Sequence, residues 1–391
     1  MSEPREAPLT AIGLMSGTSF DGVDAALVVT DGGRVERFGA AALEPYDDAF
    51  RDRLRPLLGR RPGSGSAAIG RELTLRHVEA VRRLMATEGL TAADVDVVGF
   101  HGQTVLHRPD RRETWQLGDG QLLADSLGIP VVFQFRAADI AVGGQGAPLA
   151  PLYHVALTAG MPRPLAVLNV GGVANVTWIG PGNDEDGAVL AFDTGPGNAL
   201  LDDWTRTHTG QPVDAGGRLA ATGRIDDAVV KKLLAAPFFA ERPPKSLDRD
   251  DFRRVVRRLD GMAAADGAAT LTAFTARAVA AARDFLPAAP RRWLVCGGGR
   301  HNATLMAMLA EVLGVPVDPA EDVGWQGDVL EAQAFAFLAV RSLRGLPLSL
   351  PTTTGVPAPQ TGGVLYRPRN EAERSIEATG VDARVRTART G

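Results

Sequence analysis

The sequence predicts an α/β fold built from two similar halves. The chain has 391 residues, which is more than one hydrophobic core usually organises. Apolar runs typical of strands alternate with segments of helical spacing, as in layered α/β proteins. A strand, a glycine-rich turn and a second strand occur near residue 11 and again near residue 165, which indicates a repeated unit.

The first half is expected to begin with a hairpin and to continue as strand and helix. The apolar runs Ala11–Met15 and Val23–Val29 flank the turn-forming segment Ser16–Gly22. The elements expected next are a strand at Val35–Ala42, a helix at 66–88, a strand at Val95–Phe100 that ends in His101-Gly102-Gln103-Thr104, a short helix at Gly120–Leu127 and a strand at Pro130–Phe135.

The second half repeats this pattern. Strands are expected at Leu165–Val170 and Val173–Ile179 around the turn Gly171-Gly172, and a third at Val189–Phe192 is followed by Asp193-Thr194-Gly195-Pro196-Gly197-Asn198. A helix at Ala263–Phe285, a strand at Trp293–Cys296 capped by Gly297-Gly298-Gly299 and a helix from about Asn302 complete this half. From Ser342 onward the chain is rich in proline and is expected to be mostly loop.

Two domains and a tail follow from this pattern. We predict an N-terminal domain of residues 1–138 plus about 345–368 and a C-terminal domain of residues 139–344. Residues 370–391 are charged and lack apolar periodicity, so we expect them to form a disordered tail.

Composition argues against several classes of protein. The net charge is −4, so a nucleic-acid partner is not expected. The first ten residues contain no apolar signal segment, and no apolar run of membrane-spanning length occurs, so we expect neither secretion nor a membrane partner. Cys296 is the single cysteine, which suits a reducing, cytoplasmic compartment, and its apolar neighbours predict a buried, inert thiol.

Three glycine-rich turns follow apolar strands, at Ser16–Gly22, Asp193–Asn198 and Gly297–Gly299. Successive backbone N–H groups in such turns can form anion-binding nests, and the hydroxyls of the first turn add donors. Any one of them can equally be a plain hairpin loop. Three such turns, each at the end of a strand and spread over two related halves, favour a site that holds a nucleotide in a cleft between domains. None has the Gly-Lys-Ser/Thr ending of a P-loop.

Asp193 is the candidate general base, because a carboxylate at a strand end before a tight turn can be aimed into a cleft. A turn-forming or helix-capping role explains the same pattern. Asp21 and Asp24 are rival carboxylates, and Asp21 can approach Mg²⁺ or phosphate through water or be an ordinary turn residue.

Other polar segments suit a small hydroxylated substrate or a purely structural role. They are His101–Thr104, Gln116–Gly120 and Gly143–Pro148. Glu331 opens a helix after Gly327-Asp328, where an acid in the first turn stabilises the helix.

These residues together resemble the anhydro-N-acetylmuramic acid kinase family over about residues 11–366. The resemblance rests on long motifs in order: Gly13–Asp24, Phe100–Thr104, Gln116–Gly120, Gly143–Pro148, Leu168–Asn175, Phe192–Asn198, Cys296–Gly299 and Gly327–Phe335. Phe20, the stretch Phe133–Asp139 and the segment Lys245–Asp250 depart from the residues usual in the family.

The resemblance implies the two-domain fold of actin, Hsp70 and hexokinase, with a ribonuclease H-like sheet in each domain and a nucleotide cleft between them. It also implies the reaction, in which 1,6-anhydro-N-acetylmuramic acid is opened by water and phosphorylated on O6 by ATP during peptidoglycan recycling. Because the γ-phosphoryl group captures the leaving O6, one carboxylate base suffices where ordinary glycoside hydrolysis needs two carboxyl groups. Mg²⁺ is the expected metal and a homodimer the implied assembly.

Carried over by position, Asp193 is the base and three other sets of residues bind ligands. The nucleotide-binding residues implied are Gly13, Ser16, Gly17, Thr18, Ser19, Asp21, Gly22, Gly171, Gly172, Asn175, Gly195, Gly197, Asn198, Gly297, Gly298 and Gly299. The sugar-binding residues implied are His101, Gln103, Thr104, Gln145 and Glu331, and Asp21 is the candidate metal contact.

Three rival functions remain open at this point. A kinase of an open amino sugar shares the same turns. An ATPase switch like Hsp70 or actin would be expected to carry an interaction module, and the chain shows only a short tail. A ligand sensor without catalysis would not need the carboxylate at position 193.

Overall fold

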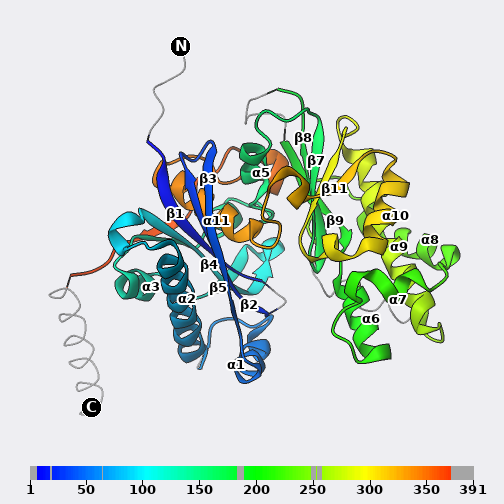
Figure 1. Ribbon diagram of the computed structural model, residues 1–391, viewed down its shortest axis with the longest axis horizontal. Helices are drawn as coiled ribbons and strands as arrows, with labels where there is room; N and C mark the ends of the chain where they lie inside the picture. The colour runs from blue at the N-terminus through cyan, green and yellow to red at the C-terminus, as the bar shows by residue number, and fades with distance from the viewer. Residues whose placement is uncertain are drawn as a thin grey trace.

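The computed structural model describes residues 7–17, 20–63, 65–182, 189–247, 252 and 258–370. Within these residues the chain forms two β-sheets that lie side by side, each with helices packed on its faces (Figure 1). The predicted disordered tail, apart from Asn370, lies outside the described residues, as do Thr18 and Ser19 of the first glycine-rich turn.

The first sheet has the strand order β12-β6-β4-β1-β2-β3, with β5 paired to β4 beside this path. β1, β2 and β3 form an antiparallel meander, whereas β4 runs parallel to β1 and β6 parallel to β4. The bounds are β1 Leu9–Ser16, β2 Gly22–Thr30, β3 Val35–Pro45, β4 Val97–Arg108, β5 Glu113–Leu117, β6 Val131–Phe133 and β12 Val364–Tyr366.

The second sheet repeats this arrangement with the order β11-β10-β7-β8-β9. β7, β8 and β9 form the antiparallel meander, and β10 and β11 continue the sheet in parallel. The bounds are β7 Leu165–Val170, β8 Val173–Ile179, β9 Val189–Pro196, β10 Trp293–Cys296 and β11 Val317–Pro319. The predicted α/β fold of two similar halves is confirmed.

Helices cover both sheets and fill the space between them. The bounds are α1 Asp48–Leu54, α2 Ser66–Glu88, α3 Gly120–Leu127, α4 Ala137–Ala141, α5 Pro151–Leu157, α6 Ala199–Thr209, α7 Arg218–Ala221, α8 Asp227–Leu234, α9 Ala264–Ala282, α10 Ala303–Leu313, α11 Leu330–Leu343 and α12 Pro351–Thr354. α5 and α11 contribute to one continuous core that joins Val97 of the first sheet to Val167 of the second. The two halves therefore share buried apolar surface, which resists their separation.

α11 packs against β1, β2 and β4 of the first sheet although it lies within residues 139–344 of the chain. Two glycines permit this close approach, since a Cβ on Gly13 would stand 1.8 Å from Ala332 O and one on Gly99 would stand 2.1 Å from Phe335 O. Gly22 is restricted by a different neighbour, the Glu44 carbonyl of β3. The predicted domain boundaries remain a prediction, and α11 is the element that connects the two halves across them.

Three expected boundaries differ from those of the structure. β4 does not end at Phe100 but continues through His101–Thr104 to Arg108, because β5 pairs with this extension. β5 itself contains Gln116 and Leu117, which were expected in a loop. β9 likewise continues through Asp193 to Pro196, since β8 provides hydrogen-bonding partners along its whole length.

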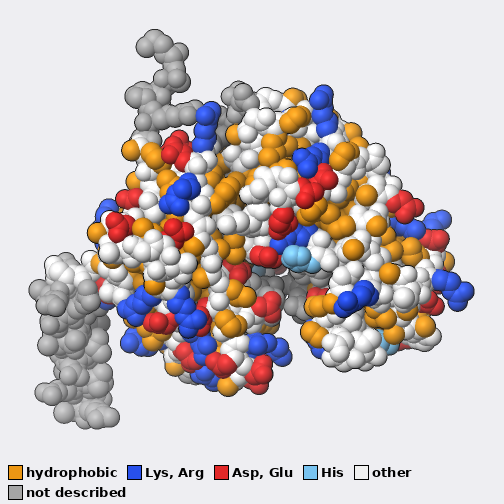
Figure 2. Space-filling model, viewed as in Figure 1, with side chains coloured by type: hydrophobic (Ala, Val, Ile, Leu, Met, Phe, Trp, Pro, Cys, Tyr) orange, Lys and Arg blue, Asp and Glu red, His pale blue; other side chains and the backbone are white. Residues whose placement is uncertain are grey.

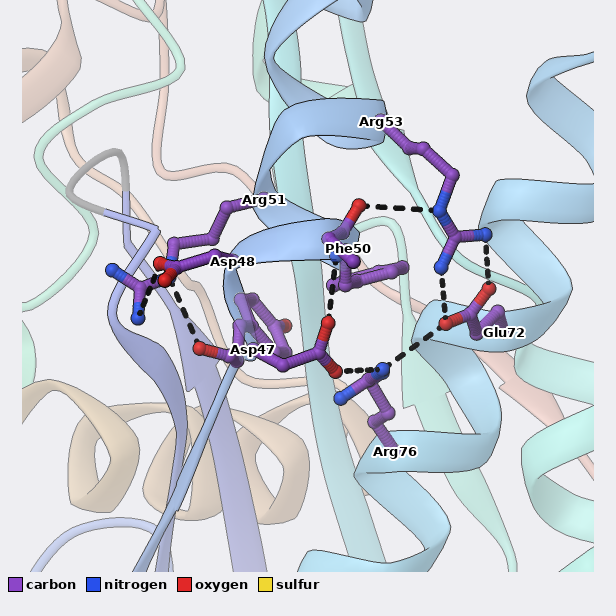
Figure 3. A network of polar contacts seen from close by, with 9 residues as sticks. Asp47, Asp48, Phe50, Arg51, Arg53, Glu72 and Arg76 are labelled. Carbon is purple, nitrogen blue, oxygen red and sulfur yellow. Dashed lines mark hydrogen bonds and ion pairs between the residues drawn. The ribbon is translucent and has the colours of Figure 1, made fainter.

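A polar network fixes α1 to α2 at the base of the first half (Figure 3). Asp47 caps α1 by accepting from Phe50 N at 2.8 Å, and its other oxygen accepts from Arg76 Nη2 at 2.6 Å. The Glu72 carboxylate of α2 accepts hydrogen bonds from both Arg53 and Arg76. This network holds the chain next to Tyr46, whose hydroxyl reaches the first glycine-rich turn.

No helix among the described residues has both the length and the apolar character needed to cross a membrane.

Candidate active site

A cavity of about 160 Å³ lies where the second sheet meets the start of α11 and the segment around α5. Figure 2 shows the surface hollowed between the two halves, with acidic side chains along the hollow. The lining residues are Arg136, Ala147, Pro148, Leu149, Ala150, His154, Asn169, Asn175, Asp193, Cys296, Gly297, Gly327, Asp328, Leu330, Glu331, Ala334 and Phe335. Four residues predicted from the sequence therefore meet in it: Asn175, Asp193, Gly297 and Glu331.

One row of side chains across the second sheet forms the floor of this cavity. Cys296 of β10 lies opposite Asn169 of β7, Asn169 opposite Asn175 of β8, and Asn175 opposite Asp193 of β9. Residues that are directly opposite on neighbouring strands point to the same face of a sheet. The register of four strands thus brings two amides, one thiol and one carboxylate together, and burial raises the pKa of the Cys296 thiol to about 12, so it stays protonated.

Asp193 is held by the segment that follows η5 (Pro237–Ala240). Its Oδ2 accepts from Leu247 N at 2.7 Å, and its own N–H donates to Lys245 O at 3.1 Å. Burial raises the pKa of the Asp193 carboxyl to about 7, while the Leu247 hydrogen bond and the Lys245 charge oppose this rise. A carboxyl with this pKa can accept a proton near neutral pH, as a general base must.

Arg136 provides a cation in the same cavity. Its Nε donates to His101 Nε2 at 3.1 Å and its Nη1 to Gly146 O at 2.6 Å. His101 donates from Nδ1 to Gly102 O at 2.7 Å, and burial together with the Arg136 charge holds the pKa of His101 well below its usual range. His101 is therefore a neutral acceptor that lies behind Arg136 and is not among the residues that line the cavity.

Glu331 opens α11 beside this cation. Its Oε1 accepts from Asn169 Nδ2 at 3.4 Å. The cleft walls desolvate Glu331 and raise the pKa of its carboxyl, and the Arg136 charge counteracts the rise. The cavity is thus lined by three carboxyl groups, those of Asp193, Asp328 and Glu331, and by one guanidinium.

The first glycine-rich turn is supported from behind by Gln103. Ser16 Oγ donates to Gln103 Oε1 at 2.6 Å and lies 2.8 Å from the Tyr46 hydroxyl, and Gln103 Nε2 donates to Gly17 O at 3.1 Å. Thr104 accepts from Gln116 Nε2 at 3.2 Å. Gln103 and Thr104, predicted to contact the sugar, both hold protein groups and do not line the cavity.

Acidic groups gather where the first turn approaches α11. Asp21 is exposed on the turn and Asp24 is half-buried at the start of β2. Burial, and to a smaller extent the negative charges of Glu331, Asp21 and Asp328, together raise the pKa of Asp24 to about 7. This mutual effect places the first turn within electrostatic reach of the cavity's acidic wall.

The glycine-rich turns of the second half pack against one another. Gly197 N donates to Gly172 O at 3.0 Å, and Asn198 N donates to Gly171 O at 2.7 Å. Asn198 Nδ2 donates to Val170 O at 3.0 Å and lies 3.6 Å from where a Cβ on Gly298 would stand. Three turns that are far apart in the sequence thus form one continuous glycine surface.

Neighbouring protein atoms explain some of the glycines of this surface but not others. Gly195, Gly297 and Gly299 are restricted by neighbouring atoms, and Gly297 also has a φ of +73°. A Cβ on Gly171 or Gly172 would meet its nearest atoms at the ordinary van der Waals distances of 3.6 and 3.7 Å, so packing within the protein does not require glycine at these two positions.

Gln145 links the two halves near the carboxylate. Its N–H donates to Thr354 O at 2.7 Å, and its Oε1 accepts from Ser246 Oγ at 2.9 Å. Because Ser246 lies between Lys245 and Leu247, Gln145 supports the segment that holds Asp193.

Sequence reasoning missed Arg136 and His154, which line the cavity. His154 lies on α5, its Nδ1 is 2.9 Å from Thr177 Oγ1, and its buried Nε2 has no hydrogen-bond partner among the described residues. Burial lowers the pKa of His154 to about 3, so the ring is neutral. No local motif marks either residue, since each reaches the site through the path of the chain between the sheets.

Comparison with known proteins agrees with this geometry. Residues 9–368 match the sequence model of the family described as anhydro-N-acetylmuramic acid kinase. A relative of that name from Rhodospirillum rubrum is 58% identical over 91% of this chain and 94% of its own length. Relatives of that name from Paramagnetospirillum magneticum and Acidiphilium cryptum are each 57% identical, over 91% and 93% of this chain and 99% of their own lengths. The predicted enzyme class, an ATP-using sugar kinase, is confirmed, and the chain belongs to the anhydro-N-acetylmuramic acid kinase family.

Proposed function

We propose that Asp193 is the base with which this kinase opens 1,6-anhydro-N-acetylmuramic acid, giving N-acetylmuramic acid 6-phosphate. The observation that carries the proposal is the position of the Asp193 carboxylate, which lines the same cavity as Arg136 and Glu331 and is oriented by Leu247 N.

In the proposed reaction one water attacks C1 of the sugar and gives its proton to Asp193. The C1–O6 bond breaks, its electron pair goes to O6, and O6 takes the γ-phosphoryl group while ADP leaves. Capture by phosphorus neutralises the charge that develops on O6, so no acid opposite Asp193 is required. Asp193 then returns its proton to solvent.

We assign the nucleotide to the glycine surface of the second half and to the first turn. Packing within the protein does not explain Gly171 and Gly172, and this glycine surface reaches the cavity at Gly297. The fixed hairpins would orient the triphosphate, which is most of what phosphoryl transfer requires. Gly13 and Gly22 lie under α11 and β3, so their packing explains them without a ligand.

Magnesium fits the acidic side of this cleft. No group of three or more metal-ligating side chains is preformed among the described residues. A kinase magnesium ion needs only one or two carboxylates besides phosphate oxygens and water, and Asp21 and Asp24 can supply them. When bound, the ion would neutralise phosphate charge.

The substrate is a carboxylic acid, and Arg136 is the cation of the cavity. We therefore assign Arg136 to the lactyl carboxylate, with His101 as the acceptor that keeps the guanidinium in place. Glu331 and the neutral His154 would form hydrogen bonds with the oxygen-containing groups of the sugar.

We further propose a cytoplasmic homodimer. The reaction uses ATP, and the single buried cysteine suits a reducing compartment. Light scattering of the purified protein tests the dimer: a monomer mass at micromolar concentration would exclude it.

The reaction is tested in ¹⁸O-water with ATP, Mg²⁺ and the anhydro sugar. We expect the sugar to gain one water and one phosphoryl group, with the label on the anomeric oxygen. Activity on an open amino sugar but not on the anhydro sugar would favour the rival sugar kinase, and ATP hydrolysis without a sugar product would favour an ATPase switch.

The base is tested with Asp193→Asn. We expect turnover to fall at least about a hundredfold, with nucleotide affinity retained, because the amide keeps the Leu247 hydrogen bond but cannot take a proton. A loss below about tenfold would refute the role of Asp193 as base.

A further inference from the structure

Lys245 has an unusual place among the basic residues of this chain. Only three of the 42 basic residues are lysine, namely Lys231, Lys232 and Lys245. Lys231 and Lys232 are exposed on α8, whereas Lys245 is buried at 7% exposure. Burial of an ammonium group costs free energy unless other groups compensate for it, so this lysine requires an explanation.

Its ammonium is enclosed by phenylalanine rings. Nζ lies 4.5 Å from the ring centre of Phe238, 4.6 Å from that of Phe285 and 5.8 Å from that of Phe192. It donates one hydrogen bond, to Phe238 O at 2.9 Å. No carboxylate of the described residues lies within ion-pair distance of it, so the rings and the Phe238 carbonyl are its direct partners.

The backbone around Lys245 holds the candidate base on two sides. Lys245 O accepts from Asp193 N, Leu247 N donates to Asp193 Oδ2, and Phe192 precedes Asp193 in β9. Residues 245–247 therefore do two things: the Lys245 side chain is anchored among the rings, and the backbone of Lys245 and Leu247 orients the Asp193 carboxylate.

We propose that Lys245 is a positioning residue for the base: its enclosed ammonium anchors the 245–247 segment that orients Asp193, and its positive charge favours the ionised carboxylate that accepts the proton of water. This inference rests on the role of Asp193 proposed above. Arginine is planar and longer, and methionine has similar bulk without charge, so two substitutions separate charge from packing.

The surrounding charges determine in which direction the pKa of Asp193 or Lys245 should move when the other group is replaced. Across the cavity Asp193 shares its walls with Arg136, Glu331, Asp328 and His154, and on its other side Lys245 lies nearby. Around Lys245 are Glu241 and Asp193, while Arg283 and Asp284 of η7 (Arg283–Phe285) are exposed. Lys245 lowers the pKa of Asp193, and Asp193 raises the pKa of Lys245, so removing either charge must move the other group.

The first experiment compares the pH dependence of kcat/KM for wild type, Lys245→Met, Lys245→Arg and the surface control Lys231→Met. In Lys245→Met we expect the acidic limb to move up by about one pH unit, so that activity falls about tenfold at low pH and recovers in alkali. Lys245→Arg should keep the limb of the wild type. An unshifted profile, or an equal loss at every pH, would overturn the electrostatic part of the proposal.

The second experiment needs no turnover and stands if the proposed reaction fails. Because the chain has three lysines, an Nζ spectrum of ¹⁵N-lysine protein contains few signals, and Lys245 is assigned by its absence from Lys245→Arg. We expect Lys245 to deprotonate at lower pH in Asp193→Asn than in wild type, by about half a pH unit or more. Identical titration of Lys245 in the two proteins would refute the coupling.

Discussion

At the residue scale, the site depends on charged groups that are incompletely solvated. Asp193 has one backbone donor and a distant ammonium in place of full hydration, and burial is the largest influence on its pKa. Arg136 faces a neutral imidazole that is fixed as an acceptor by its bond to Gly102 O. Such arrangements favour reaction at the expense of stability.

Asp193→Asn should therefore stabilise the fold in a pH-dependent way. The native carboxyl keeps its proton up to about pH 7, whereas the unfolded one loses it near pH 3.8, so the native state binds more protons in between. The contribution of Asp193 to the free energy of unfolding falls as the pH rises through this window.

We expect the variant to exceed wild type by on the order of 1–4 kcal/mol at pH 8, with no gain at pH 4. Urea unfolding at both pH values measures this difference. Equal differences at the two pH values would contradict the raised pKa.

At the element scale, most of the hairpins could be predicted from the sequence because their signals are local. The runs around Gly171-Gly172 and the helix at 66–88 have the bounds that their apolar spacing indicates. Asp193 could be found for the same reason, since a carboxylate before glycines at the end of an apolar run is a local pattern.

Other elements depend on partners that are distant in sequence. Gly102 interrupts the apolar run and suggests the end of a strand, yet β4 continues because β5 pairs with it. α12 and β12 are too short to show periodicity, and β12 exists because β6 offers an edge. Arg136 and His154 reach the cavity only through the packing of α4 and α5 between the sheets, which no single motif encodes.

Two glycines provide a matched test of packing against ligand binding. Gly13→Ala forces a Cβ against the backbone of α11, and we expect a loss of about 3 kcal/mol or more in the free energy of unfolding. Gly171→Ala adds a Cβ that meets its nearest atom at an ordinary van der Waals distance. The free energy of unfolding should therefore change by less than about 1 kcal/mol, while the KM for ATP rises. Thermal unfolding and kinetics of both variants measure this, and a stable Gly13→Ala protein with weakened ATP binding would instead favour a phosphate contact at Gly13.

At the scale of the whole molecule, one buried acidic residue adds polar contacts to the apolar core that the two halves share. Asp139 of α4 accepts from Gly146 N at 2.6 Å and from the hydroxyls of Ser349 and Thr354. Ser349 and Thr354 lie in the segment that follows α11, and α12 of this segment contacts β9 of the second sheet. The Asp139 carboxyl thus ties the segment after β6 to the segment after α11, beside the residues that hold Asp193.

Asp139→Ala would leave three buried donors without their acceptor. We expect a loss of about 3 kcal/mol or more in the free energy of unfolding, together with a lower kcat. Asp139→Asn, which retains one acceptor oxygen, should lose less. Urea unfolding of both variants measures the order, and equal stability of Asp139→Ala and wild type would show that this junction does not support the fold.

The contacts of Asp139 also restrict how the cleft between the two halves can open. Because Asp139 holds the segment after β6 and the segment after α11 at one point, we expect any opening of the cleft to be a rotation about this point. The glycine surface and the sugar pocket would then widen in proportion to their separation from Asp139. The angle of this rotation would then decide both whether the nucleotide can enter and whether the attacking water is retained.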